Sequence, residues 1–324
     1  MTAAQQLQHW LSDRSAQRRT QRDIDAFGRA WNCGPVRKRF DTALAALRRP
    51  TAQAVAEAVG GLLTDDGWVD ALIHGLTERL RADPFFDPPF RAINSDIHKG
   101  LIVLEHNWVS IAIGVAGAAE LAAKKSSPRG ATSVGFSGRL TLLKFVKAGG
   151  ALLSFWEAPP ITRAFSAADA GSCRRTGERR LADGEMLVVD GSRQGYVIEQ
   201  AGANLLILQA EITCDQAPVA AEYDSASRRY VGCSANGDDA SRIQMLSTLL
   251  RKLGGDEAFD AITPFLDHPD FFVRWHVMRE LLGIDARAVM PALERMASQD
   301  PHPDVRRAAA AALGRMASEK RRAA

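Results

Sequence analysis

The stretch His-Pro-Asp-Phe-Phe-Val-Arg at residues 268–274 returns in shortened form as His-Pro-Asp-Val-Arg at residues 302–306. The Val-Arg pairs of the two copies lie 32 residues apart, and each begins an apolar segment that ends in Leu-Gly, at 282–283 and at 313–314. A fixed period of this length is typical of stacked helical hairpins. Arg242 lies one further period of 32 residues upstream, so we expect about two and a half hairpins. Because so short a stack is near the minimum for independent stability, we also expect it to pack against the preceding domain.

Hydrophobic periodicity divides the rest of the chain. Up to residue 95, apolar residues recur at helical spacing, as at Ile24, Phe27 and Trp31. Short apolar runs separated by Gly then indicate the strands of a sandwich or barrel, and the Ala/Glu/Lys-rich segment 118–125 favours a short helix between strands. The expected fold class is α+β multidomain, with a helical N-terminal region packing on the barrel at 1–95, a central antiparallel β-domain at 96–234, helical repeats at 241–318 and a tail at 319–324.

Composition and charge exclude several classes of function. The net charge of +3 is too small to indicate nucleic-acid binding. Residues 1–40 hold eight Lys/Arg against three Asp/Glu, which is a contact for an acidic partner or, more simply, a solvated helix face. The four cysteines are scattered, which favours neither a zinc site nor a disulfide framework and fits a reducing cytoplasm. No apolar run is long enough to span a bilayer, and the first 30 residues have no signal-peptide core, so we expect a soluble cytoplasmic protein.

The C-terminal segment resembles HEAT-type helical repeats, because the Asp-x-x-(x)-Val-Arg start and the Leu-Gly end each occur twice between residues 242 and 318. The resemblance implies hairpins of two helices in which Asp and Arg near the start of the second helix tie neighbouring hairpins together. Asp270 and Arg274 are four residues apart, as partners on one helix would be, whereas Asp304 and Arg306 are two apart. It also implies that the tail docks a protein or peptide partner.

The middle segment resembles the cupin class of double-stranded β-helix. The later cupin motif runs Gly-x5-Pro-x-Gly-x2-His-x3-Asn, and from Gly184 this chain has Asp190 for Pro, Ser192 for Gly, Gly195 for His and Glu199 for Asn. The strand–turn–strand rhythm is therefore retained, while the metal-binding histidine is lost.

The earlier cupin motif runs Gly-x5-His-x-His-x3/4-Glu. Gly100 and His106 match its first two positions, but Trp108 stands for the second His, and Ala112 or Ile113 for the Glu. One of the four implied metal ligands remains, and the resemblance therefore implies a degenerate metal site.

A metal site could still be improvised from His98, His106 and a carboxylate such as Glu199. The two histidines are eight residues apart, so they share a face of a strand only if that strand is unbroken. Iron, manganese or zinc needs three or four converging ligands. The alternative is that both histidines are hydrogen-bonded at the rim of the barrel, with no metal cofactor.

No residue pattern supports nucleophilic catalysis, and we name no catalytic residue. The candidate pocket residues are an aromatic–carboxylate pair at Trp156 and Glu157, together with Tyr196 and Glu199. A carboxylate against an aromatic ring would have a raised pKa through desolvation, unless Glu157 is an ordinary polar residue at a strand end. The basic cluster 174–180 is a weaker candidate for an acidic peptide or nucleotide, because few aromatics accompany it.

Three hypotheses for function follow. The first is a non-catalytic binding or adaptor protein, whose cupin-like domain recognises a ligand or peptide while the HEAT-like tail docks a protein. The second is a metal-dependent cupin-type enzyme, such as an iron oxygenase, acting on a peptide or small molecule through a non-standard site. The third is a regulator in which ligand occupancy of the barrel alters the packing of the tail. The missing ligands favour the first.

Overall fold

A computed structural model describes residues 2–126, 133–254 and 257–323. The N-terminal helices are α1 (Ala3–Ser12), α2 (Arg14–Asn32), α3 (Pro35–Ala45), α4 (Ala52–Thr64) and α5 (Gly67–Ala82). Thr51 caps α4, because its Oγ1 accepts a hydrogen bond from the backbone N–H of Ala54. α5 ends just before Asp83 and Pro84, as the proline predicts.

The central domain consists of antiparallel strands with one inserted helix, α6 (Ala118–Ser126), at the expected place. The strands are β1 (Arg91–Asn94), β2 (His98–His106), β3 (Val109–Ala116), β4 (Ser133–Phe136), β5 (Leu140–Lys147), β6 (Leu152–Glu157), β7 (Arg174–Arg180), β8 (Glu185–Asp190), β9 (Gln194–Gln200), β10 (Leu205–Ile212), β11 (Val219–Asp224) and β12 (Tyr230–Ala235). One sheet has the order β1-β2-β3-β10-β5-β8. Facing it are β12-β11-β4 and β7-β6-β9, and β4 lies beside β9.

This strand order is a double-stranded β-helix. Counted from β3 to β10, the first, eighth, third and sixth strands form one sheet, and the second, seventh, fourth and fifth form the other. The chain therefore passes back and forth between two facing sheets, as in the jelly rolls that include cupins. The cupin-like architecture expected from the sequence is confirmed, with helices at both ends of the chain as expected.

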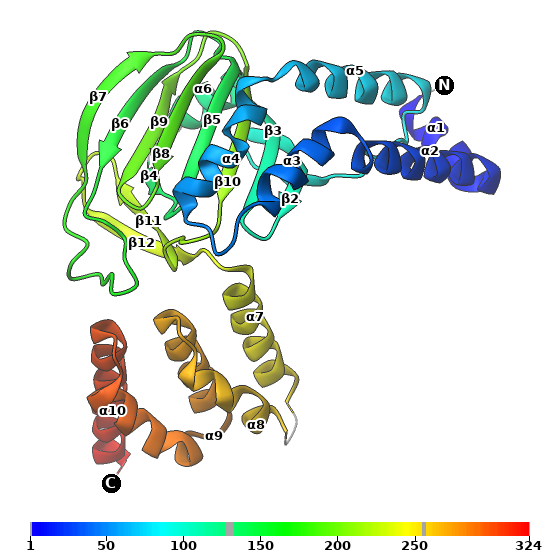
Figure 1. Cartoon of the computed structure of the whole chain (residues 1–324). Helices are drawn as coiled ribbons and strands as arrows, with labels where there is room; N and C mark the ends of the chain where they lie inside the picture. Colours follow the sequence, from blue (N-terminus) through cyan, green and yellow to red (C-terminus); the bar gives the residue numbers. More distant parts are fainter. Residues whose placement is uncertain (1, 127–132, 255–256, 324) are drawn as a thin grey trace.

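Helices α3 and α4 cover the outer face of the larger sheet (Figure 1). Side chains alternate along its strands, so Leu208, Ala210 and Ile212 of β10 pack under the helices, whereas Leu205 and Ile207 face the interior of the roll. The sheet is thus buried on both faces, which explains why its strands read as nearly continuous apolar runs.

Three strands carried no clear signal in the sequence. β1 lies within the segment expected to be helical, and β4 is only four residues long. β7 was expected to lie in a polar loop, since four of its residues are arginines, and in the structure all its residues are exposed. It is the edge strand of its sheet, and a charged edge of this kind discourages pairing with another chain.

The C-terminal helices are α7 (Asp238–Leu253), α8 (Ala258–Ile262), the 3-10 helix η1 (Thr263–Asp267), α9 (Phe271–Gln299) and α10 (Pro303–Ala323). Asp285 has non-helical backbone angles and kinks α9 into two helices. Two full hairpins result, preceded by α7 as a half hairpin, as the repeat predicts. α10 continues to Ala323, through residues expected to form a tail.

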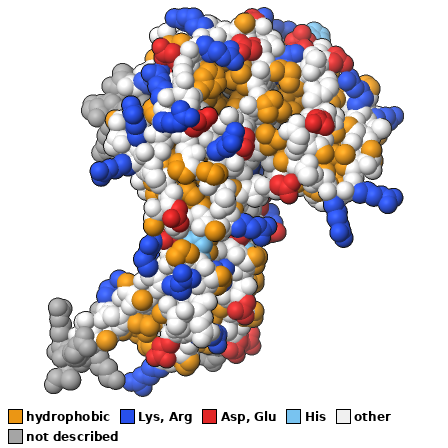
Figure 2. Space-filling model, turned by 60° about the vertical axis from the view of Figure 1, so that its left-hand side comes forward, with side chains coloured by type: hydrophobic (Ala, Val, Ile, Leu, Met, Phe, Trp, Pro, Cys, Tyr) orange, Lys and Arg blue, Asp and Glu red, His pale blue; other side chains and the backbone are white. Residues whose placement is uncertain are grey.

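The tail packs on the β-domain through one patch of residues, as expected for so short a stack. His302 Nε2 lies 2.9 Å from the carbonyl oxygen of Phe165, and Asp304 Oδ2 accepts a hydrogen bond of 2.9 Å from the backbone N–H of Ala167. Phe271 stacks on the His302 ring and joins the apolar cluster around Tyr223. Figure 2 shows the tail as a smaller lobe below the β-domain, with acidic and basic side chains interspersed on this face. No helix of the described ranges is long and apolar enough to cross a membrane.

Candidate ligand-binding cavity

A cavity of about 860 Å³ lies between the two sheets of the roll. Its walls come from β4, β5, β8, β9, β10, α6 and the β11–β12 hairpin. Phe136, Val189 and Ile198 give it apolar surfaces, while Gln209 and Glu211 make one end polar. Cavities of this size, mostly apolar with a few placed polar groups, are typical of small-molecule sites.

Glu211 and Gln209 reach the cavity because they continue the inward-facing register of β10. Leu205 and Ile207 occupy the preceding inward positions, and side chains on a strand alternate with a period of two residues. The sequence interpretation ended this strand at residue 208 and therefore missed both residues. The signal was present, because Gln209-Ala210-Glu211 continues the same alternation.

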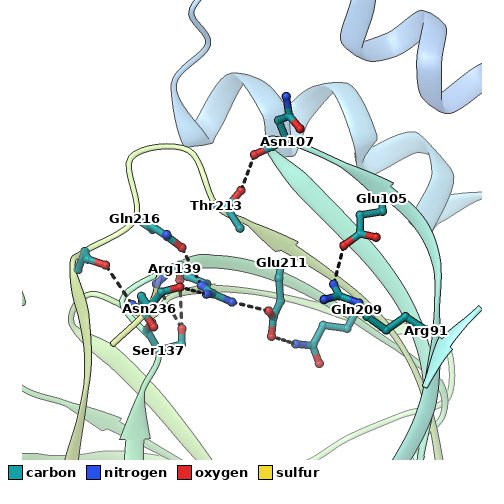
Figure 3. A network of polar contacts seen from close by, with 11 residues as sticks. Arg91, Glu105, Asn107, Ser137, Arg139, Gln209, Glu211, Thr213, Gln216 and Asn236 are labelled. Atoms are coloured by element: carbon teal, nitrogen blue, oxygen red, sulfur yellow. Dashed lines mark hydrogen bonds and ion pairs between the residues drawn. The ribbon is translucent and has the colours of Figure 1, made fainter. Parts of the chain in front are cut away.

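The carboxylate of Glu211 is held in a network of polar contacts (Figure 3). Arg139 Nη1 donates to Glu211 Oε2 at 2.9 Å, and Gln209 Nε2 donates to Oε1 at 2.7 Å. Arg139 is itself fixed by Gln216 Oε1 at 2.9 Å and by the carbonyl oxygen of Asn236 at 2.6 Å. The polar end of the cavity is thus rigid, and its negative charge is balanced by the guanidinium group.

Tyr196 of β9 also lines the cavity. Burial, and secondarily the charge of Glu211, raises the pKa of Tyr196 to about 12. The hydroxyl therefore stays protonated, and within the described residues it has no hydrogen-bond partner. An unpartnered O–H on a cavity wall is available to a ligand.

His98 lies at the far end of the cavity from Glu211. His98 of β2 is the register partner of Ala116 of β3, and Ala116 is in turn the partner of Leu205 of β10. Leu205 comes six residues before Glu211 on the same strand. Six residues of strand span about 20 Å. Partial desolvation and the nearby charge of Lys124 lower the pKa of His98, although its side chain is still exposed, and this favours the neutral imidazole. The two polar residues cannot bind one ion.

His98 and His106 do not come together either. β2 has a bulge between Ile102 and Leu104, and the extra residue reverses which face the later side chains take. His106 therefore points to the helix-covered face, where its ring lies against Phe40 and Trp108. Within the described ranges, no group of three or more His, Cys, Asp or Glu residues is placed to hold a metal ion. His98 and His106 therefore lie on opposite faces of the sheet and do not converge on one point.

Gly195 shows why this part of the roll carries no histidine. Gly184 to Glu199 does form the expected strand–turn–strand, as β8 and β9. A Cβ atom on Gly195 would lie 2.7 Å from the carbonyl oxygen of Gly135 on β4, which is too close for any side chain. The position that aligns with the metal-binding histidine of the motif is therefore closed to it.

The remaining pocket candidates lie outside the residues that line the cavity. Trp156 is buried in the cluster beneath the tail, where its indole N–H donates to Ser154 Oγ at 2.9 Å. Glu199 accepts from Ser154 at 2.5 Å and from Lys125 at 2.6 Å. Burial raises the pKa of Glu199, but these hydrogen bonds outweigh that effect and lower it below its usual value. Glu157 is ion-paired with Arg174 of β7, and neither Glu157 nor Trp156 is among the residues that line the cavity.

The basic cluster of β7 is neutralised in the same way, because several of its arginines have acidic partners. The pairs are Arg174 with Glu157, Arg175 with Glu178 and Arg179 with Glu185. No free basic surface for a nucleotide or acidic peptide results from these three arginines.

The arginine of the repeat ties neighbouring hairpins together, but not through the partner expected. Arg274 binds Asp300 with two hydrogen bonds, from Nε to Oδ2 at 2.8 Å and from Nη2 to Oδ1 at 2.7 Å. Its Nη1 also donates to the carbonyl oxygens of His268 and Pro269. The expected Asp270–Arg274 side-chain pair is therefore wrong, because Asp270 precedes α9 and the guanidinium turns toward the next hairpin.

The second copy of the motif has a different role. Arg306 Nη1 donates to the carbonyl oxygen of Asp300 at 2.6 Å, so both repeat arginines meet at the same residue. Asp304 instead binds the backbone of Ala167 in the β-domain. The repeat-structural role expected for these residues thus includes fastening the tail to the barrel.

Comparisons with known proteins agree with the tail assignment. A family model of HEAT repeats matches residues 233–314. No curated protein matches the chain. The HEAT-type character of the tail is therefore established, over about a quarter of the sequence.

Solved structures that match about two fifths of the chain include cupins. A cupin domain from Bordetella pertussis is 8% identical with a TM-score of 0.23, over 38% of this chain and 99% of that one. A sugar phosphate isomerase of the cupin superfamily from Silicibacter pomeroyi is 12% identical with a TM-score of 0.23, over 43% and 77%. The 7S globulin of Momordica charantia is 12% identical with a TM-score of 0.26, over 42% and 36%. At this similarity the double-stranded β-helix rests on the strand order of this chain itself.

Proposed function

We propose that this chain is a non-catalytic binding protein, in which the β-domain cavity holds a small organic ligand and the HEAT-type tail docks a protein partner. The observation that carries the proposal is a cavity of about 860 Å³ with apolar walls, with Gln209 and Glu211 at one end and His98 and Lys124 at the other. The closed position at Gly195, where the motif has its metal-binding histidine, supports a binding role over metal-dependent chemistry.

The polar groups around Glu211 favour a neutral, hydroxyl-bearing part of a ligand at this end of the cavity. Glu211 is already balanced by Arg139, so a cationic ligand is not required. Among the described residues, no hydrogen bond involves the Tyr196 hydroxyl or the carboxamide oxygen of Gln209, so both can meet a ligand, while the Gln209 nitrogen donates to Glu211. Val189 and Ile198 would contact the apolar part of such a molecule.

The proposed function needs no metal. Metal analysis of freshly purified protein tests the metal-free binding role directly. Stoichiometric iron, manganese or zinc would refute that role and would support the alternative of an oxygenase-like metalloenzyme. The four cysteines are free thiols, which supports action in a reducing cytoplasm.

The tail suits a docking role because HEAT repeats are interaction modules, and because the hydrogen bonds of His302 and Asp304 fix it to the barrel. Partner capture from extract by the full chain tests this role. The control is a chain that ends before α7, which should lose the partner. Capture that persists without the tail would contradict the proposal.

Ligand binding is tested by thermal shift against hexoses, polyols and nucleosides, and by native mass spectrometry of the protein as purified. Tyr196→Phe and Gln209→Ala should each weaken a hit about tenfold, as expected for loss of one or two hydrogen bonds. Glu157→Gln, outside the cavity, is the matched control. Equal affinity in all three variants would place the ligand elsewhere.

A further inference from the structure

Helix α7 carries an apolar stripe on its exposed side. Met245, Leu246, Leu249 and Leu253 are 64%, 52%, 46% and 74% exposed, although they are large hydrophobic residues. Leu246, Leu249 and Leu253 recur at spacings of three and four residues, and Met245 lies four residues before Leu249, so together they form one continuous face. The opposite side of α7 packs through Ile243 and Leu250 into the core of the tail.

The repeat explains why this face is open. α7 occupies the place of the second helix of a hairpin, one period before the first half of α9. It follows directly on strand β12, so its hairpin has no first helix in this chain. The two helices of a hairpin run antiparallel, and a helix that filled the gap would therefore run antiparallel to α7.

The charges of α7 indicate what fills it. The first turn carries Asp238 and Asp239, and the last turn carries Lys252. Asp238, Met245 and Lys252 are spaced by seven residues, so they lie on the same flank of the stripe. In an antiparallel helix pair with a two-fold axis at the middle of α7, this flank of each helix meets the same flank of the other. A parallel pair would instead bring the two acidic ends together.

We propose that α7 is a self-association surface, on which a second copy of this chain packs its own α7 antiparallel. The axis passes between Met245 and Leu246, the midpoint of the helix. Asp238 of each copy then meets Lys252 of the other, and Leu249 of each packs beside Arg242. Four apolar side chains per copy make a small interface, so the dimer dissociates on dilution. The proposal does not depend on the ligand of the cavity.

Sedimentation velocity over a range of concentrations of the full chain is the first test. The wild type should form dimers as concentration rises, and Leu249→Glu should remain monomeric. Val231→Glu, which changes an exposed apolar residue on β12, outside the stripe, is the matched control and should dimerise normally. Circular dichroism of each variant checks that the exposed substitution leaves the fold intact. A wild type that is monomeric at its highest soluble concentration, or a Leu249→Glu variant that still dimerises, overturns the proposal.

Charge exchange tests the antiparallel orientation. Asp238→Lys and Lys252→Asp should each weaken self-association about tenfold or more, because two facing pairs become repulsive. The double variant Asp238→Lys/Lys252→Asp should recover dimerisation, and a mixture of the two single variants should form heterodimers. Failure of both rescues would refute the antiparallel arrangement.

Discussion

Replacing Arg274 by Ala should loosen the C-terminal hairpins more than any change of a surface charge. The Arg274 side chain is 9% exposed and that of Asp300 is 4% exposed. The substitution removes two hydrogen bonds to the carboxylate and two to backbone carbonyl oxygens. It leaves the buried Asp300 carboxylate with the backbone N–H of His302 as its remaining donor within the described chain.

The expected cost is about 3–5 kcal/mol, the usual range when one partner of a buried ion pair is removed. In the full-length protein, the opening constant measured by hydrogen exchange across residues 271–316 should rise by roughly two to three and a half orders of magnitude. Arg274→Lys should rescue little, because an ammonium group cannot make the bidentate contact.

Arg242 provides the control, since it stands one repeat earlier but is 69% exposed and lies 3.9 Å from Asp239. Arg242→Ala should change stability by no more than about 0.5 kcal/mol. The double variant Arg274→Ala/Asp300→Ala should lose less than the sum of the single variants, because neither charge is then left unpaired. Equal exchange rates in Arg274→Ala and Arg242→Ala would refute the reasoning.

Three further predictions concern the β-domain and its helices. Gly195→Ala should lower the free energy of unfolding by about 1–3 kcal/mol, because the new methyl group clashes with the Gly135 carbonyl oxygen. Gly61→Ala, whose methyl group meets open space on α4, should raise it by about 0.4–1 kcal/mol. Thermal denaturation compares the two variants, and a Gly195→Ala variant as stable as the wild type would contradict the close approach of β4 and β9. Burial raises the pKa of Tyr196 and of Tyr223 to about 12 and also raises that of Tyr230, so titration at 295 nm should show little tyrosinate in the folded protein near pH 10, where a denatured control ionises. Because the tyrosine pKa values are higher in the folded protein than in the unfolded chain, their contribution to stability is complete below about pH 10 and is lost between about pH 10 and 12. A urea midpoint that stays constant over that pH range would contradict this contribution. His106→Ala should leave ligand affinity unchanged while His98→Ala alters it, since only His98 lines the cavity; calorimetry with a bound ligand separates them.

The sequence predicted elements best where one periodicity ran without interruption. The repeat at residues 268–306 predicted the hairpins and the half hairpin at α7, because each copy carries its own start and end signals. Apolar runs located most strands of the roll in the same way. The sequence did not predict β7, because an edge strand needs no apolar residue and β7 forms by pairing with β6.

The candidate site was less predictable, because its residues come from strands that are distant in sequence. Of the four expected pocket residues, only Tyr196 lines the cavity. Gln209 and Glu211 continue the alternation of β10, but no motif marks them as cavity residues. Arg139, the partner of Glu211, lies 72 residues earlier in the chain, just before β5.

By itself, the sequence determined the helical repeat, the change from helix to strand and back, and the loss of the histidine at position 195, because these are properties of local spacing and residue type. Only the tertiary structure decided which side chains meet. The bulge in β2 sends His98 and His106 to opposite faces, the approach of β4 closes the space beside Gly195, and the turn into α10 brings Asp300 to Arg274. Each of these outcomes depends on a register or an approach between segments far apart in the chain, which no local pattern encodes.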